Sequence, residues 1–176
     1  MNEVLANQLA FAGSAFLSSD AARLADLLEG LREAQEEIAA LLLALRSGDI
    51  DREYVRLFYD PLGAVCPPWQ SARGEEPRLM GESHVSATGW YRQAGLEPQL
   101  SNEPADHIGL LLLFAAHLVR HEPAALARFQ AEHLAWMPEY LNQLAGATKH
   151  PFYAGLAAFT AARLDAISSS PTPATA

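Results

Sequence analysis

The sequence predicts an all-α protein, a single-domain bundle of about eight or nine helices with one long connection rich in proline and glycine. Apolar residues recur at three- and four-residue spacing over most of the chain, which is the period of an α-helix. No segment shows the apolar–polar alternation of a strand, and no repeat of fixed length is present. The chain has 176 residues, 50% of them hydrophobic, so it can bury a core without disulfides or a metal.

The first third of the chain carries the spacing of helices over 3–17 and 20–46, with Gly30 as a candidate break in the second. Ser18-Ser19-Asp20 is a start signal for that second segment, and Ser47-Gly48-Asp49 ends it and opens the next. The helix that follows, in the stretch IDREYVRLFYDP, places Tyr54, Leu57 and Phe58 on one face. Asp60-Pro61 ends it.

Residues 59–83 form a long connection, in which no period survives. It contains seven proline and glycine residues: Pro61, Gly63, Pro67, Pro68, Gly74, Pro77 and Gly81. Compact domains seldom keep such a loop without a role in binding, gating or exchange between subunits. Its charged stretch RGEEPR, residues 73–78, is expected to be a solvated turn.

Helical spacing resumes in the second half of the chain. Helices are expected over 83–94 and 103–120, from Pro123 to about residue 133, from Pro138 and from Pro151. Proline is tolerated in the first turn of a helix because the N–H that it lacks would have no partner there. The predicted domain spans residues 1–167, and the stretch 168–176, rich in serine and proline, is expected to be a flexible tail.

The charge balance excludes some classes of partner. Twenty-one acidic residues against twelve basic ones give a net charge of −9, which repels the phosphates of nucleic acids and attracts a basic partner. Cys66 is the only cysteine, so no internal disulfide can form and a reducing compartment is expected. The first residues contain Glu3 and no basic cluster, so they predict a helix and not an export signal. No apolar run approaches the roughly 20 residues of a membrane span, and we expect a cytoplasmic protein.

Catalytic and metal-binding motifs have little support. His117 and His121 lie four residues apart on one helix face, but the sequence marks no third ligand, so no metal is expected. Ser71, Asp106 and His107 lack a nucleophile elbow, and adjacent residues on a helix point about 100° apart. The chain has no phosphate-binding loop either. We therefore expect neither an enzyme nor a bound cofactor.

Two segments are unusual for a structural helix and its loop. NEPADH, residues 102–107, opens a leucine-rich helix, and capping by Asn102 with Glu103 and Asp106 against the positive end of the helix dipole explains part of it. His107 stays unexplained. In CPPWQS, Trp69 follows two prolines, whose stiff backbone suits an aromatic platform. Together the two segments indicate a binding role.

These residues also carry a family resemblance. The stretches EYVRLFYDPLGAVCPPWQS (53–71), NEPADHIGLLLLFAAHL (102–118) and HPFYAGLAAF (150–159) resemble the TorD/DmsD family of redox-enzyme maturation chaperones, with the DmsD branch the nearest. The likeness covers residues 53–160 in one order. After Ser71 the family usually continues with an aromatic or aliphatic pair, whereas ARGEEPR follows here.

The resemblance implies a cytoplasmic chaperone that binds the twin-arginine signal peptide of a molybdopterin oxidoreductase subunit. It would aid cofactor insertion and hold the precursor back from export until loading is complete. The peptide-binding positions that the family motifs imply are Tyr54, Leu57, Phe58, Leu62, Pro68, Trp69, Glu103, Pro104, Asp106 and His107.

The chemistry of such a peptide agrees with these residues. Two guanidinium groups beside an apolar stretch require carboxylates beside apolar surface, which Glu103 and Asp106 next to Trp69 would provide. His107 is a candidate for pH-sensitive binding. The alternative is a permanent assembly subunit of an oxidoreductase complex, with a constant apolar interface. The chain can be a monomer or a domain-swapped dimer. The sequence does not identify the oxidoreductase that is its client.

Overall fold

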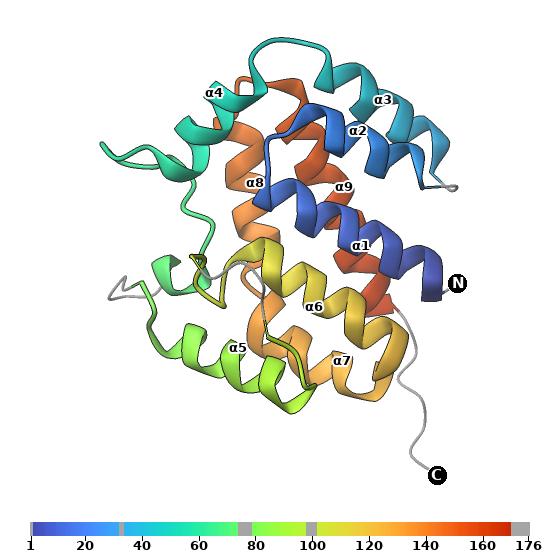
Figure 1. The fold of residues 1–176 in the computed structure, drawn as a ribbon, viewed down its shortest axis with the longest axis vertical. Helices are drawn as coiled ribbons and strands as arrows, with labels where there is room; N and C mark the ends of the chain where they lie inside the picture. The colour runs from blue at the N-terminus through green and yellow to red at the C-terminus, as the bar shows by residue number, and fades with distance from the viewer. Residues whose placement is uncertain (1, 32–33, 74–78, 98–101, 170–176) are drawn as a thin grey trace.

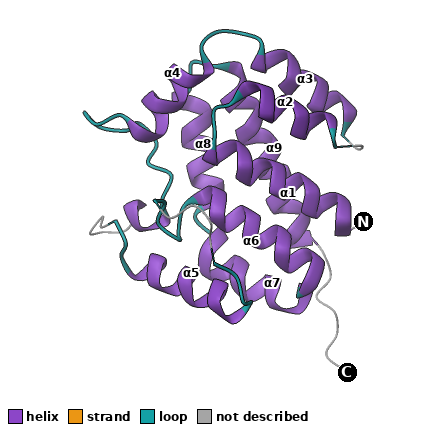
Figure 2. Ribbon diagram, in the orientation of Figure 1, coloured by secondary structure: helices purple, strands orange, loops and turns teal. Residues whose placement is uncertain are grey.

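The fold is all-α, as the sequence predicts. The computed structural model describes residues 2–31, 34–73, 79–97 and 102–169, and within them it has nine α-helices and no named strand (Figures 1 and 2). The helices are α1 (Asn2–Leu17), α2 (Ala21–Glu29), α3 (Gln35–Leu45), α4 (Ile50–Tyr54), α5 (Glu82–Gln93), α6 (Ile108–His121), α7 (Pro123–Phe129), α8 (Met137–Ala147) and α9 (Pro151–Ser169). None of the helices described is long and apolar enough to cross a membrane.

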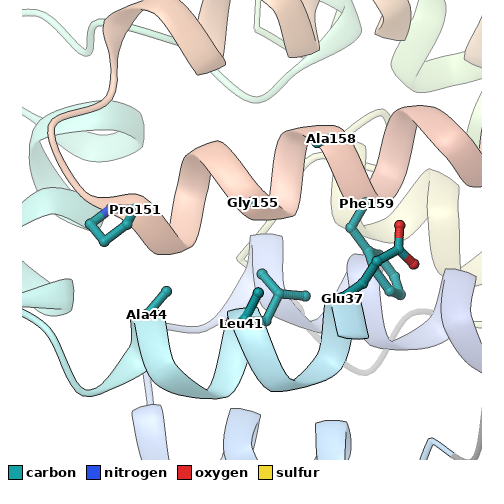
Figure 3. Close-up of a pocket in the computed structure, with 8 residues that line it drawn as sticks. Glu37, Leu41, Ala44, Pro151, Gly155, Ala158 and Phe159 are labelled. Carbon is teal, nitrogen blue, oxygen red and sulfur yellow. The ribbon is translucent and has the colours of Figure 1, made fainter. Parts of the chain in front are cut away.

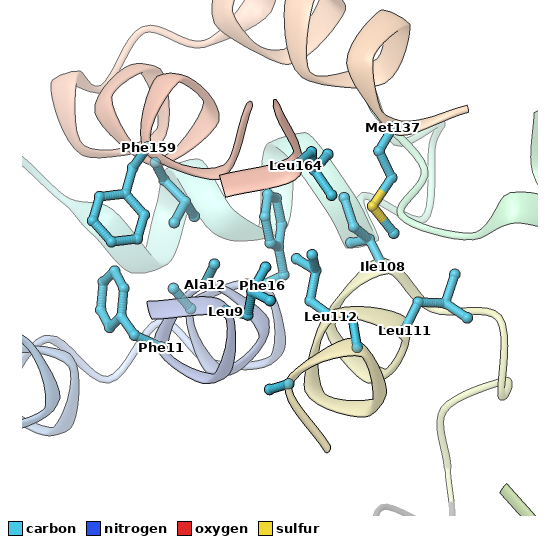
Figure 4. Packing of buried hydrophobic residues seen from close by; sticks show 14 of the residues in the cluster. Leu9, Phe11, Ala12, Phe16, Ile108, Leu111, Leu112, Met137, Phe159 and Leu164 are labelled. Carbon is cyan, nitrogen blue, oxygen red and sulfur yellow. The ribbon is translucent and has the colours of Figure 1, made fainter. Parts of the chain in front are cut away.

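The core forms where α1 and α6 lie side by side and where α8 and α9 pack behind them (Figures 1 and 4). Helix α6 is apolar on almost every side, so it lies inside the bundle. Two glycines let the backbones of α1 and α6 touch, because a β-carbon on Gly109 would lie 2.6 Å from the carbonyl oxygen of Gly13. The aromatic and aliphatic side chains of α1, α6, α8 and α9 fill the space between these helices.

The predicted boundaries hold least well where the chain enters or leaves the long connection. In the first third of the chain, the segment 20–46 is divided as Gly30 suggests, since Gly30 caps α2.

At the entry to the long connection, the helix predicted over IDREYVRLFY is α4 followed by a π-helix, Val55–Tyr59. The returning connection uses carbonyl groups of that π-helix, because Cys66 donates its N–H to the Leu57 oxygen at 2.7 Å. A second π-helix, Gln130–Leu134, continues α7.

The prediction of a helix over 103–120 was wrong at its start. Helix α6 begins at Ile108, its N-cap is His107, and Asn102 lies in the preceding turn. The connection takes the backbone groups that a longer helix would have needed. Ile108 donates its N–H to the Pro68 oxygen at 2.8 Å, Gln70 donates to the Asp106 oxygen at 3.1 Å, and Trp69 and His107 form an isolated β-bridge.

Two other predictions extend beyond the residues that the structure describes. Within the connection the described part contains a short 3-10 helix, Gln70–Arg73, whereas positions 74–78 of the predicted solvated turn are outside it. Helix α9 continues to Ser169, and positions 170–176 of the predicted tail also lie outside the described residues. The division into a domain over 1–167 and a tail stays a prediction.

Candidate functional site

The carboxylate of Glu103 is the centre of the candidate site. It accepts a hydrogen bond from the Tyr59 hydroxyl at 2.9 Å and another from the Trp69 indole N–H at 3.3 Å. The two rings that hold it meet edge to face, with their centroids 5.9 Å apart. Tyr59 ends the π-helix after α4, and Trp69 follows the stiff Pro67-Pro68 pair. Segments 44 and 34 residues away in sequence therefore fix one half-buried carboxylate.

A buried hydrogen-bond chain lies behind Glu103. The Nδ1 atom of His107 accepts the N–H of Gly109 at 3.0 Å, so the neutral ring carries its proton on Nε2. That proton points to the Tyr59 oxygen, 3.1 Å from Nε2, and leaves the Tyr59 proton to be donated to Glu103. The chain joins the N-terminus of α6 to the carboxylate.

Burial sets the protonation states along this chain. It lowers the pKa of His107 from 6.5 to about 3, because the charged imidazolium would lose its hydration. Burial likewise raises the pKa of Tyr59 above that of an exposed tyrosine. The ring is therefore neutral at physiological pH and acts as a helix cap and hydrogen-bond donor, which does not favour the prediction that His107 makes binding pH-sensitive.

Asp106 faces the interior. Its side chain is fully buried, and Oδ2 accepts the backbone N–H of Ser71 at 2.7 Å. Neither Oδ1 nor the Ser71 hydroxyl has a hydrogen-bond partner among the described residues. Asp106 thus fastens the 3-10 helix of the connection onto the turn before α6. The sequence suggested that Asp106 presents its carboxylate beside Glu103 at the surface, but the carboxylate is buried.

The remaining predicted residues divide into a buried and an exposed group. Leu57, Phe58, Pro68 and Pro104 are buried, and the Phe58 ring packs edge to face against its aromatic neighbours. Leu62 is 97% exposed on the loop that projects after the π-helix (Figure 1).

Tyr54 is half-buried between these groups. Its ring lies 5.3 Å from that of Tyr59, and its hydroxyl donates to the Phe16 oxygen at 3.2 Å. The structure therefore brings Trp69, Glu103 and His107 together around Tyr59, while Leu57 and Phe58 are buried in the core and Phe58 packs against Tyr54.

Tyr59 is the residue that the sequence reasoning missed. An α-helical face through Tyr54, Leu57 and Phe58 leaves Tyr59 pointing elsewhere, but the π-helix brings it back beside Tyr54. The two tyrosines lie five residues apart, which is the hydrogen-bond spacing of a π-helix. That spacing was the one available signal.

The connection is also fixed from its other side. The ring of His133 contacts both the Gln70 side-chain oxygen, at 2.9 Å, and the Ser86 hydroxyl, at 3.1 Å. The Gln70 amide donates to the backbone oxygen of Glu132 at 2.9 Å. The 3-10 helix after Trp69 is therefore held between the turn before α6 and the end of the second π-helix.

A separate groove lies between α3 and α9, and none of the predicted site residues lines it (Figure 3). It encloses about 310 Å³ and is apolar except for Glu37, whose carboxylate pairs with the buried guanidinium of Arg163 at 2.5 Å. On α6 the rings of His117 and His121 lie 4.6 Å apart. Within the described ranges, no three His, Cys, Asp or Glu residues are grouped so that they could hold a metal ion.

Comparisons with known proteins fit this geometry. Residues 24–151 match the family described as nitrate reductase delta subunit. The chain is 34% identical to the Tat proofreading chaperone DmsD of Salmonella typhi over 130 residues, which are 70% of this chain and 63% of that protein. It is 33% identical to the protein of the same name from Salmonella typhimurium, with the same coverage.

A solved structure described as a redox enzyme maturation protein of Archaeoglobus fulgidus superposes with a TM-score of 0.66 and 25% identity, over 94% of each chain. The chain spans about 63% of the length of the curated Salmonella relatives. The names of these relatives describe chaperones and maturation proteins and not catalysts, in agreement with the expectation that the chain is not an enzyme.

Proposed function

This chain belongs to the family described as nitrate reductase delta subunit, as its resemblance to the TorD/DmsD chaperones led us to expect, and on that basis we propose that it is a chaperone for a redox enzyme. It binds, in the cytoplasm, the twin-arginine signal peptide of a molybdopterin oxidoreductase subunit. Binding aids cofactor insertion and delays export of the precursor.

The observation that carries the proposal is the fixed carboxylate of Glu103. An ionised carboxylate has about four acceptor positions, and Tyr59 and Trp69 use one on each oxygen. The free positions can accept the parallel N–H groups of a guanidinium. The Trp69 ring beside them offers a face on which a planar guanidinium stacks. Because both oxygens are already oriented, little conformational entropy is lost on binding.

Apolar surface lies on the same segment as Tyr59. Val55, at the start of the π-helix, is 48% exposed, and Leu62 and Val65, in the loop after it, are 97% and 39% exposed. A signal peptide carries its apolar stretch next to the arginines, so these side chains are placed to contact it. The net charge of −9 favours the encounter with a basic peptide.

The buried positions take supporting roles in this proposal. Asp106 holds Trp69 in place through the backbone of Ser71, and His107 orients Tyr59. Leu57 and Phe58 are buried core residues, and the Phe58 ring packs edge to face against Tyr54. The reading of arginine therefore falls to Glu103 and not to a pair of carboxylates.

Calorimetry with a synthetic signal peptide tests the proposal. Replacing Glu103 with Gln removes the charge and should weaken binding at least about tenfold, since a hydrogen bond to a charged group contributes roughly 1.5–3 kcal/mol. The matched control is Glu29→Gln, which removes one negative charge from an exposed position on α2 and should leave the affinity unchanged. A peptide with two lysines in place of the arginines should bind the native chain more weakly.

Equal affinities of Glu103→Gln and the native chain would contradict the proposal. Reversibility separates the chaperone from a permanent subunit of an oxidoreductase complex. Excess signal peptide should release a precursor from the chaperone, whereas a complex of constant composition that resists the peptide would favour the permanent subunit.

A further inference from the structure

The half-buried Arg73 places its guanidinium over the ring of Tyr140, a residue of α8 that is fully buried in this state. Its central carbon is 5.1 Å from the centroid of the Tyr140 ring and 5.8 Å from that of Trp136. Its Nη2 atom donates to the side-chain oxygen of Gln143 at 2.7 Å. Arg73 ends the 3-10 helix that begins just after Trp69.

We propose that Trp136, Tyr140 and Gln143 form a guanidinium-binding subsite for an arginine of the signal peptide, and that Arg73 occupies it while the peptide is absent. The proposal rests on the function proposed above and adds a second arginine position to it. The occupant in the structure identifies the ligand class, because the same three contacts would be made by any arginine side chain.

The subsite is preorganised by its own helix. Trp136, Tyr140 and Gln143 follow one another at intervals of four and three residues, so they share one face of α8 and its N-cap. The exposed Glu139 lies on that same face and adds negative charge. Arginine, planar and always charged, suits a site with two ring faces and an amide oxygen.

Both rings are held from behind. The Trp136 indole donates to the His133 oxygen at 2.8 Å, and the Tyr140 hydroxyl donates to the Cys66 oxygen at 3.1 Å. The two ring centroids are 5.1 Å apart. Departure of Arg73 would leave these two rings in place, so a second guanidinium would meet the same surface.

The position of Arg73 relative to Trp69 suits a pair of adjacent arginines. Trp69 lies beside Glu103, Arg73 lies on α8, and Ala72 donates its N–H to the Trp69 oxygen at 3.1 Å. A rise of about 2 Å per residue in a 3-10 helix puts the two ends of this segment about 8 Å apart. Adjacent side chains of an extended peptide point in opposite directions. One arginine can therefore reach Glu103 while the next reaches α8.

Arg73 then competes with the peptide. When the protein's own side chain occupies a site in part of the molecules, the apparent affinity of a ligand equals its intrinsic affinity multiplied by the fraction of molecules in which the site is free. Removing Arg73 should therefore tighten binding of the signal peptide, although the substitution removes the contacts of Arg73 with Trp136, Tyr140 and Gln143.

Calorimetry of Arg73→Ala with the synthetic twin-arginine peptide tests this inference. The affinity should rise about two- to fivefold, the factor that corresponds to a cation–π contact at a partly exposed site. The matched control is Arg128→Ala. Arg128 also stacks on an indole, at 4.2 Å from the Trp90 ring, so its removal costs the same charge and the same kind of contact. If general repulsion of the basic peptide were the cause, both variants would gain equally, and that result would overturn the proposal.

A second measurement does not depend on the signal peptide. In Arg73→Ala, methylguanidinium should shift the indole N–H resonance of Trp136, assigned by its loss in Trp136→Phe, and methylammonium should shift it less. In Arg73→Ala with Gln143→Ala, the shift should shrink. Absence of the methylguanidinium shift, or unchanged affinity of Arg73→Ala for a peptide that the native chain binds, overturns the subsite. Should the native chain fail to bind the peptide while the shift is seen, the guanidinium site stands, whereas its assignment to the signal peptide and the proposed chaperone function fail.

Discussion

Replacing Tyr59 with Phe removes one hydroxyl that joins two partners of different kinds. The carboxylate of Glu103 loses a donor 2.9 Å away, and the Nε2–H of His107 loses its acceptor. Water can replace the first contact because Glu103 is only half-buried. It cannot readily replace the second, because His107 is fully buried.

The magnitude follows from that second loss. A buried donor without an acceptor costs about 1–3 kcal/mol, so we expect the free energy of unfolding to fall by about 2 kcal/mol. In a chain of this size each kcal/mol lowers the thermal midpoint by about 2–4 °C, which gives a fall of about 4–8 °C. Urea denaturation followed by circular dichroism measures the free energy directly. Binding of the signal peptide should also weaken, because Glu103 loses one of its two positioning contacts.

Tyr153→Phe is the matched control. The Tyr153 hydroxyl is buried in the same aromatic cluster but has no hydrogen-bond partner among the described residues, so its removal should leave the stability equal or slightly higher. The reasoning is refuted if Tyr59→Phe unfolds at the same urea concentration as the native chain, or if Tyr153→Phe loses as much stability as Tyr59→Phe.

Two more predictions concern stability. Between pH 7 and 5 the unfolded chain takes up a proton at His107, with its ordinary pKa of 6.5, whereas the folded chain, with a pKa of about 3, does not. The free energy of unfolding should therefore fall by about 2 kcal/mol on acidification, and His107→Asn, whose amide oxygen can still cap α6, should show a shallower fall in urea titrations at each pH. Gly109→Ala should cost about 1–3 kcal/mol through overpacking against Gly13, whereas Gly89→Ala, with open space around its α-carbon, should stabilise by about 0.5–1 kcal/mol. Equal midpoints for the two alanine variants would show that the close approach of α1 and α6 at Gly109 does not restrict the side chain.

Helix periodicity predicts most of the fold because packing in this bundle follows the same three- and four-residue spacing that the sequence displays. It fails where distant backbone groups compete for helix ends. Nothing in the stretch 103–107 reveals that Gln70 donates to the Asp106 oxygen or that Ile108 donates to the Pro68 oxygen. Those two bonds stop α6 from starting earlier, and they depend on the position of a connection whose path the local pattern does not contain.

The candidate site, like the fold, was predictable where local sequence chemistry decides and not where distant contacts decide. The proximity of Trp69 and Glu103 could be inferred, because two unusual segments with complementary chemistry point to one place. The burial of Asp106 and His107 could not, since exposure depends on what covers a turn. A carboxylate before a leucine-rich helix is compatible with a surface role or with a buried bond to Ser71, and the structure selects the second.

The location of the candidate site links its geometry to the stability of the core. Glu103 is oriented by Tyr59, Tyr59 contacts His107, and His107 caps the most buried helix of the bundle. Shifting Glu103 therefore disturbs the start of α6, so its carboxylate is held more rigidly than a surface glutamate on a loop. Rigidity of this kind favours recognition of a planar guanidinium over an ammonium, because parallel bonds need two oxygens in fixed positions. In Tyr59→Phe, which breaks the Tyr59–His107 contact, calorimetry should accordingly show a larger loss of affinity for the arginine peptide than for the lysine peptide.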